Sequence, residues 1–163
     1  LRKTPGTLDA FDDMLVAFTS DANGAPVLFA CRCTADPGKP IRLAPKRRDG
    51  YGIWAESQQV DGFALGDHHP GTAGAYPCFR PQVPIPVLRY TSATDTTGTP
   101  GTSNATQIHR ASATRESTVV DAWSAGCTVI ANPDDYRVLI DLAHAQIASG
   151  HSRFTVSLLE WAG

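Results

Sequence analysis

The chain has 163 residues, an apolar fraction of 42% and a net charge of −2 at neutral pH. This length can bury a substantial core, and the near balance of charge argues against a nucleic-acid partner, which would normally need a basic stripe. No apolar run approaches the roughly 18 residues needed to span a bilayer, and no charged-then-apolar signal peptide opens the chain. We therefore expect residues 1–163 to form a single domain.

Strand-like runs dominate the first half of the chain. Two β-rich runs, 12–21 and 26–35, flank an Asn-Gly dipeptide that is typical of tight hairpins. Residues 51–66 are typical of one or two further strands with a polar interruption. Glycines, prolines and polar residues indicate turns or loops at 36–40, 43–50 and 68–77.

The second half alternates strands with a polar segment. Residues 84–93 predict another strand, and the Thr/Gly/Ser-rich run 94–107 predicts a mobile loop. A short strand is expected at 108–112, before the cysteine segment 119–130. The chain closes with a strand-like run at 153–161.

The clearest helix is expected at 132–150. Asn132 is a good N-cap, Pro133 suits the first turn, and Gly150 ends the pattern. Apolar residues recur as one stripe that should pack on a sheet, at positions 136, 139, 140, 143 and 147. We therefore predict a mostly β fold with one long helix near the C-terminus, an α+β class.

Three of the four cysteines are expected to be structural. One residue separates Cys31 from Cys33, which fits neither zinc knuckles nor thioredoxin-like motifs. On a strand the two would point to one face, as core neighbours. Buried reduced thiols are the expectation for both and for Cys78, with a disulfide to Cys78 left open.

The fourth cysteine, Cys127, lies in the run VVDAWSAGCTVI. A thiol becomes a useful nucleophile when a base removes its proton, and histidine is the usual base. His144 and His151 belong to the helix and its end, so structural roles are expected there. His109 differs, because it ends a short apolar strand 18 residues before Cys127.

Fourteen residues separate His109 from the run Ser124-Ala125-Gly126-Cys127. This pattern resembles the active-site signature of the L,D-transpeptidase (YkuD-type) family, in which a histidine precedes Ser/Thr-His-Gly-Cys at a similar distance. The runs DDMLVAFTSD, TADPGKP, LGDHHPG, AYPCFRP and WSAGC resemble a phage and bacterial branch of that family. The resemblance implies an L,D-transpeptidase-like β-sandwich or barrel.

The resemblance also implies a role for each matching residue. Cys127 would attack an amide carbonyl as a thiolate and form a thioester, with His109 as base and then as acid for the leaving amine. Gly126 would let backbone amides approach the carbonyl oxygen, and the N–H of Cys127 would serve as an oxyanion donor. Ser124 would hold the loop or bond near the imidazole. No cofactor and no metal are implied.

The sequence departs from the family pattern beside these residues. Ala125 stands where most members have a second histidine, Thr128 and Val129 replace the usual pair after the cysteine, and Arg110-Ala111 replaces Gly-Thr. The Cys127–His109 pair survives these changes. They leave the choice between transpeptidation and hydrolysis open.

Three more residues are candidates for binding substrate. His68 could orient substrate or the catalytic pair, although adjacent histidines at 68 and 69 point to opposite faces of an extended chain. Arg110 could pair with a carboxylate of a peptide stem. Trp123 is either a packing residue or a stacking platform.

The sequence thus predicts a cysteine enzyme acting on peptidoglycan stem peptides as an L,D-transpeptidase, or as an L,D-carboxypeptidase or endopeptidase. Because the chain begins with Leu1 and its only methionine is Met14, we expect a piece of a longer protein, such as a lysin or an antibacterial effector. The resemblance places it in the periplasm, the cell envelope or outside the cell, with an immunity protein as partner if it is an effector. Two alternatives remain: a zinc-dependent hydrolase using His68, His109 and Cys127, and a non-catalytic β-rich binding module.

Overall fold

The computed structural model describes residues 2–3, 8–21, 23–55 and 58–160. This part of the chain is mostly β, with one long helix near its C-terminal end, as the sequence predicts. The elements in chain order are β1 (Arg2–Lys3), β2 (Asp13–Ser20), β3 (Pro26–Thr34), α1 (Lys39–Leu43), β4 (Tyr51–Trp54), β5 (Gln58–His68), β6 (Tyr76–Pro81), β7 (Ile85–Tyr90), β8 (Thr99–Ser103), β9 (Ile108–Arg110), β10 (Thr128–Ile130), α2 (Pro133–Ala148) and β11 (Phe154–Glu160).

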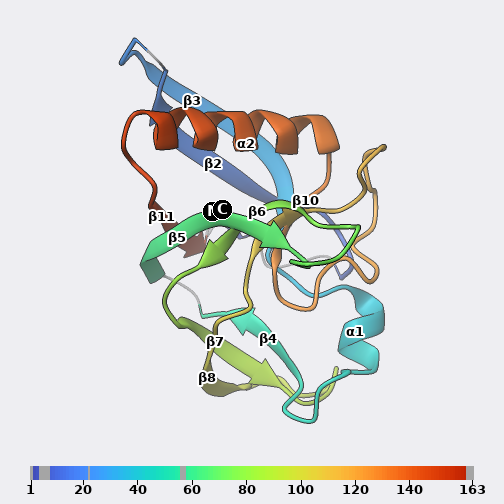
Figure 1. The fold of residues 1–163 in the computed structure, drawn as a ribbon. Coiled ribbons are helices and arrows are strands. Elements are labelled where there is room, and N and C mark those ends of the chain that lie inside the picture. Colours follow the sequence, from blue (N-terminus) through green and yellow to red (C-terminus); the bar gives the residue numbers. More distant parts are fainter. Residues whose placement is uncertain (1, 4–7, 22, 56–57, 161–163) are drawn as a thin grey trace.

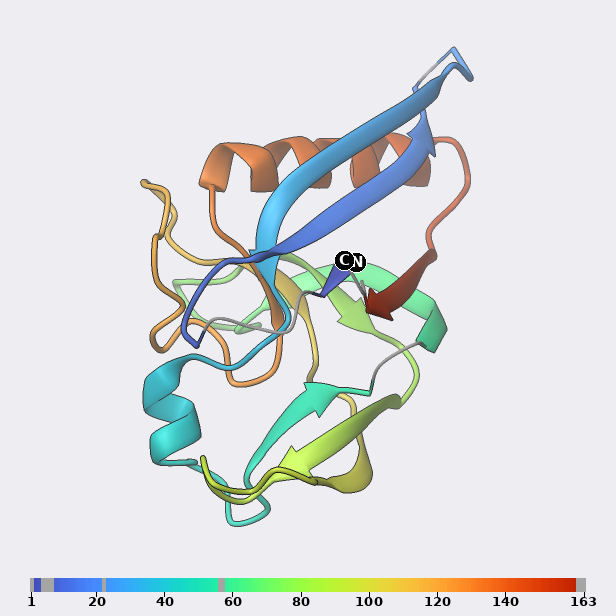
Figure 2. The ribbon, with the colours of Figure 1, turned by 180° about the vertical axis from the view of Figure 1, so that it is seen from behind.

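Eight of the strands form one strongly curled sheet in the order β1-β11-β5-β6-β9-β10-β3-β2. The sheet closes because β1 pairs with both β11 and β2. Its longest antiparallel pairing is that of the β2–β3 hairpin, which Figure 2 shows as the long blue pair of strands. The register runs from Asp13 opposite Cys33 to Ser20 opposite Pro26. The predicted Asn-Gly turn joins the two strands, and Gly24 there has a φ of +81°.

Helix α2 lies along the hairpin and covers the inside of the curled sheet (Figure 1). The side chain of Asn132 accepts a 2.8 Å bond from the N–H of Asp134, so the predicted N-cap is confirmed. The apolar stripe is buried at Tyr136, Leu139, Ile140 and Ala143. Its fifth position, residue 147, lies at the exposed edge of the stripe. No helix in the described ranges is long and apolar enough to cross a membrane.

A small sheet, in the order β4-β7-β8, lies at the end of the molecule opposite α2 (Figure 1). Trp54, Ile85 and Val87 project from it into the same apolar core as the closed sheet. Trp54 stacks on Phe63 of β5 with ring centroids 5.7 Å apart. The small sheet is therefore packed against the closed sheet through a shared core.

Three segments differ from the sequence-based expectation. The short helix α1 occupies part of the predicted turn and loop at 36–50, with Pro40 in its first turn. Strand β6 was missed, because its run YPCFRP has a proline near each end and follows a Gly-rich turn. Strand β8 forms within the run 94–107, where a mobile loop was expected, because its backbone pairs with β7. The final strand is confirmed as β11, and position 161 of the predicted run lies outside the described residues.

Three cysteines are buried as expected. Cys31 and Cys33 lie on the core side of β3, and Cys78 lies on β6. All are free thiols, as is the less buried Cys127. Burial raises the pKa of Cys31 and of Cys78 to about 12, so both are protonated at neutral pH.

Candidate active site

The candidate site is built on the parallel pair β9–β10. Val129 pairs with His109, and Thr128 pairs with Ile108. Side chains of paired residues point to the same face of a sheet, and residues two apart on a strand share a face. Cys127, Gln107, His109 and Val129 therefore lie on one face, while Ile108 points into the core on the other. The topology thus sets Cys127 and His109 on the same face of neighbouring strands, although 17 residues separate them in the sequence.

Cys127 is half-buried at the start of β10, against a small apolar cluster that includes Phe11, Val120 and Val129. Its thiol donates to the carbonyl oxygen of Ala105 over 3.5 Å. Its Sγ also accepts the backbone N–H of Gln107 over 3.4 Å. In this resting arrangement, among the described residues, the thiol bonds the main chain of 105–107 and not the imidazole of His109.

The turn before Cys127 depends on Gly126 and Ser124. Gly126 has a φ of +117°, and a Cβ added there would lie 1.7 Å from the carbonyl oxygen of Gly52 in β4. Only glycine therefore lets this turn lie against the small sheet. The fully buried Ser124 accepts the N–H of Gly126 over 3.1 Å and donates to the carbonyl of Cys127 over 2.9 Å. Ser124 thus holds the loop, one of its two expected roles, and does not bond the imidazole.

The backbone N–H of Cys127 has no hydrogen-bond acceptor within the described ranges. By contrast, the N–H of Gly126 is used by Ser124. Of these two amides, the N–H of Cys127 is therefore the one that could bond a ligand at this turn.

His109 is held in one orientation by the end of β9. Its Nδ1 lies 2.9 Å from the carbonyl oxygen of Arg110, and a carbonyl can only accept. Nδ1 therefore carries the proton, and Nε2 is left as the basic nitrogen. The hydroxyl of Tyr76 donates to the same carbonyl over 3.3 Å and lies 3.4 Å from Nδ1. Only 3% of His109 is exposed, so its ring is fixed by packing as well.

Burial shifts both His109 and Cys127 toward their neutral forms. Desolvation lowers the pKa of His109 to about 4, against a smaller opposing effect of its bond to Arg110. Desolvation also raises the pKa of the Cys127 thiol, against the smaller effect of the Gln107 N–H. These directions favour a resting thiol and a neutral imidazole. They do not favour the thiolate expected from the sequence.

His68 lies beside His109 and is hydrogen-bonded to Gln107, a residue that the sequence analysis did not single out. Its ring stacks on His109 with centroids 4.3 Å apart and planes 22° apart. Its Nδ1 lies 2.6 Å from Oε1 of Gln107, the residue whose N–H bonds Cys127. Gln107 also accepts from the thiol of Cys78 over 3.6 Å. Alternation along β9 could have identified Gln107, because it lies two residues before His109.

The other candidate residues are placed differently. The guanidinium carbon of Arg110 lies 3.9 Å from the centre of the Tyr76 ring, beside His109, so Arg110 belongs to the site. Trp123 is 45% exposed, and no ring contact joins it to another described residue. His144 and His151 are exposed and lie on or just after α2.

The geometry does not favour the zinc alternative. The stacked rings of His68 and His109 present their faces to each other, whereas metal-binding nitrogens must converge in the ring planes. Within the described ranges, no three His, Cys, Asp or Glu side chains form a group that could hold a metal ion.

An apolar pocket of about 810 Å³ lies between α2, β2 and β11. Phe79 and Ile108 contribute to its wall. Because side chains alternate along β9, Ile108 faces the opposite side from His109. The pocket is therefore separate from the candidate site.

Comparison with known proteins adds no assignment: no family model, curated protein or solved structure matches the chain.

Proposed function

We propose that the chain is a cysteine-dependent enzyme that acts on peptidoglycan stem peptides through an acyl-enzyme on Cys127. The supporting observation is the register of β9 and β10, which sets Cys127 and His109 on one face with Nδ1 of His109 bound to a backbone carbonyl. The nucleophile then comes from the start of β10, while the base and the carbonyl that orients it are consecutive residues of β9.

The chemistry starts from neutral groups. Cys127 turns from the carbonyl of Ala105 toward His109, and Nε2 takes the thiol proton as sulfur bonds to the scissile carbonyl carbon. The backbone N–H of Cys127 stabilises the resulting oxyanion. The proton on His109 then passes to the leaving amine, which departs and leaves a thioester. Water or a second amine attacks this thioester, giving hydrolysis or transpeptidation.

The substrate class rests on the sequence motif. The Ser124-to-Cys127 run and the upstream His109 resemble the L,D-transpeptidase signature, so the scissile bond follows an L-configured third residue of a stem peptide. The buried Ser124 and the close packing of Gly126 agree with a turn built to present the thiol. A lysin or antibacterial effector acting in the cell envelope is the context that this substrate implies.

The test is intact mass spectrometry after incubation with disaccharide tetrapeptide muropeptides. Loss of the terminal D-alanine marks a carboxypeptidase, and cross-linked dimers mark a transpeptidase. Either product should form with the native chain and disappear with Cys127→Ala. Cys31→Ala is the matched control, since Cys31 lies on the core side of β3, and it should retain activity. Absence of product and of any acyl adduct on Cys127 would favour a non-catalytic binding module.

A further inference from the structure

Arg89, on the small sheet, is a charged residue close to the Cys127 turn, the turn formed by residues 124–127. Arg89 of β7 pairs with Gly52 of β4, and its side chain shares a face with Val87, which points into the common core. The guanidinium therefore lies on the side of the small sheet that faces the closed sheet. Its side chain is 18% exposed, so a ligand could still reach it.

Glycines on both neighbouring strands leave room for this guanidinium. A Cβ on Gly52 would lie 3.3 Å from Nη1 of Arg89, and one on Gly101 would lie 3.5 Å from its Cγ. The first of these contacts is tighter than ordinary packing, so a side chain at Gly52 would displace the guanidinium.

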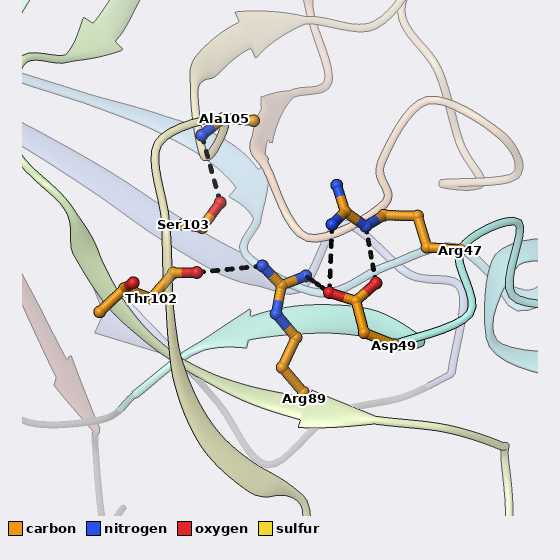
Figure 3. Close-up of polar contacts among 6 residues, drawn as sticks. All are labelled: Arg47, Asp49, Arg89, Thr102, Ser103 and Ala105. Carbon is orange, nitrogen blue, oxygen red and sulfur yellow. Dashed lines mark hydrogen bonds and ion pairs between the residues drawn. The ribbon is translucent and has the colours of Figure 1, made fainter.

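The charge of Arg89 is incompletely compensated. Nη2 donates to the carbonyl oxygen of Thr102 over 3.1 Å, but a carbonyl carries no net charge (Figure 3). The nearest carboxylate, that of Asp49, lies 3.9 Å from Nη1, beyond hydrogen-bond distance. Asp49 is already held by Arg47 through two bonds of 2.8 and 3.1 Å. The guanidiniums of Arg47 and Arg89 thus share the carboxylate of Asp49. Within the described ranges, Nη1 and Nε of Arg89 donate no hydrogen bond.

Both strands beside Arg89 lead to Cys127. The carbonyl of Gly52 lies against Gly126, the residue before the cysteine. On the other side, the chain runs from Thr102 past the end of β8 to Ala105, whose N–H donates to Oγ of Ser103 (Figure 3). The carbonyl of Ala105 accepts the Cys127 thiol. Arg89 and the turn that carries Cys127 therefore contact the same two stretches of backbone, β4 at Gly52 and the segment 102–105.

We infer that Arg89 binds a free carboxylate of the acyl-donor peptide next to the scissile bond, an inference that rests on the proposed function. A guanidinium carries a positive charge and several N–H donors, so it matches a carboxylate in charge and in hydrogen bonding. The guanidinium of Arg110, the residue that the sequence indicated for this role, instead lies over the ring of Tyr76. Arg89 is thus a specificity residue, and it selects acidic over amidated peptides.

The test measures binding without chemistry, by calorimetric titration of the Cys127→Ala chain. The probes are the tetrapeptide L-Ala-γ-D-Glu-meso-diaminopimelate-D-Ala and the same peptide amidated at one carboxylate at a time. Loss of one charged hydrogen-bonded pair should weaken binding about 10- to 100-fold for one of the amides. Arg89→Gln should remove this preference, and Arg89→Lys should keep part of it.

Arg137→Gln is the charge-matched control, because Arg137 pairs with Asp134 on α2 at the far end of the molecule. It should keep the full preference, and thermal unfolding should show that each variant is folded. The inference is overturned if folded Arg89→Gln still prefers the acid, if Arg110→Gln removes the preference instead, or if neither peptide binds. Turnover by the native chain tests the proposed function separately, since no titration here depends on the thiol.

Discussion

Gly126 should tolerate no side chain. Its φ of +117° is costly for any other residue, by about 1–3 kcal/mol. A Cβ would also lie 1.7 Å from the carbonyl oxygen of Gly52, so β4 and the Cys127 turn would have to separate. Because both costs add, we expect Gly126→Ala to lower the free energy of unfolding by about 3–5 kcal/mol. For a chain of this size the corresponding fall in Tm is roughly 6–20 °C.

Urea unfolding followed by tryptophan fluorescence measures this loss, and Gly150→Ala separates its two parts. Gly150 also has a positive φ, +95°, but no atom lies within 4 Å of its added Cβ. That control should lose about 1 kcal/mol, from backbone conformation alone. Equal losses in the two variants would refute the close approach of Gly126 to Gly52. Gly126→Ala should also lose any muropeptide activity, since the turn carries Cys127.

Three further predictions concern the same site. Ser124→Ala removes both bonds of a buried hydroxyl and should cost about 1–3 kcal/mol in urea unfolding, while the exposed Ser149→Ala should stay within about 0.5 kcal/mol of the native chain. Since the pKa of His109 falls from 6.5 to about 4 on folding, the unfolded chain binds that proton first as the pH falls. The contribution of His109 to the free energy of unfolding is therefore fully present above pH 6.5. It is lost between pH 6.5 and 4, by up to about 3 kcal/mol. His109→Gln should flatten this part of the pH–stability curve. Because the pKa of Cys127 is raised, iodoacetamide should alkylate it more slowly at pH 7 than it alkylates a free thiol, and the rate should still rise beyond pH 9. Peptide mass spectrometry measures this rate. A plateau below pH 8 would show a thiolate instead.

Much of the β architecture was accessible from local pattern. The Asn-Gly turn with its flanking runs predicted the β2–β3 hairpin, and the Asn132 cap with its apolar stripe predicted α2. Each signal depends on residues close together in the chain, which is why it could be read without tertiary contacts. Strands β6 and β8 gave no such signal, because their prolines, glycines and threonines do not favour a strand locally. These segments are extended because β6 pairs with β5 and β8 pairs with β7.

For the site, Cys127, His109 and the glycine turn could be proposed from the chain alone, because the spacing of His109 from Ser124-Ala125-Gly126-Cys127 can be read directly. Most of the groups that surround them are known only from the folded structure. Alternation along β9 could have identified Gln107, but not its bond to His68. Tyr76 and Ala105 reach the site through hydrogen bonds between segments far apart in the chain, and such contacts leave no pattern in the sequence. The same holds for the neutral resting state, since the shifts at His109 and Cys127 arise mainly from desolvation, and burial is a property of the whole fold.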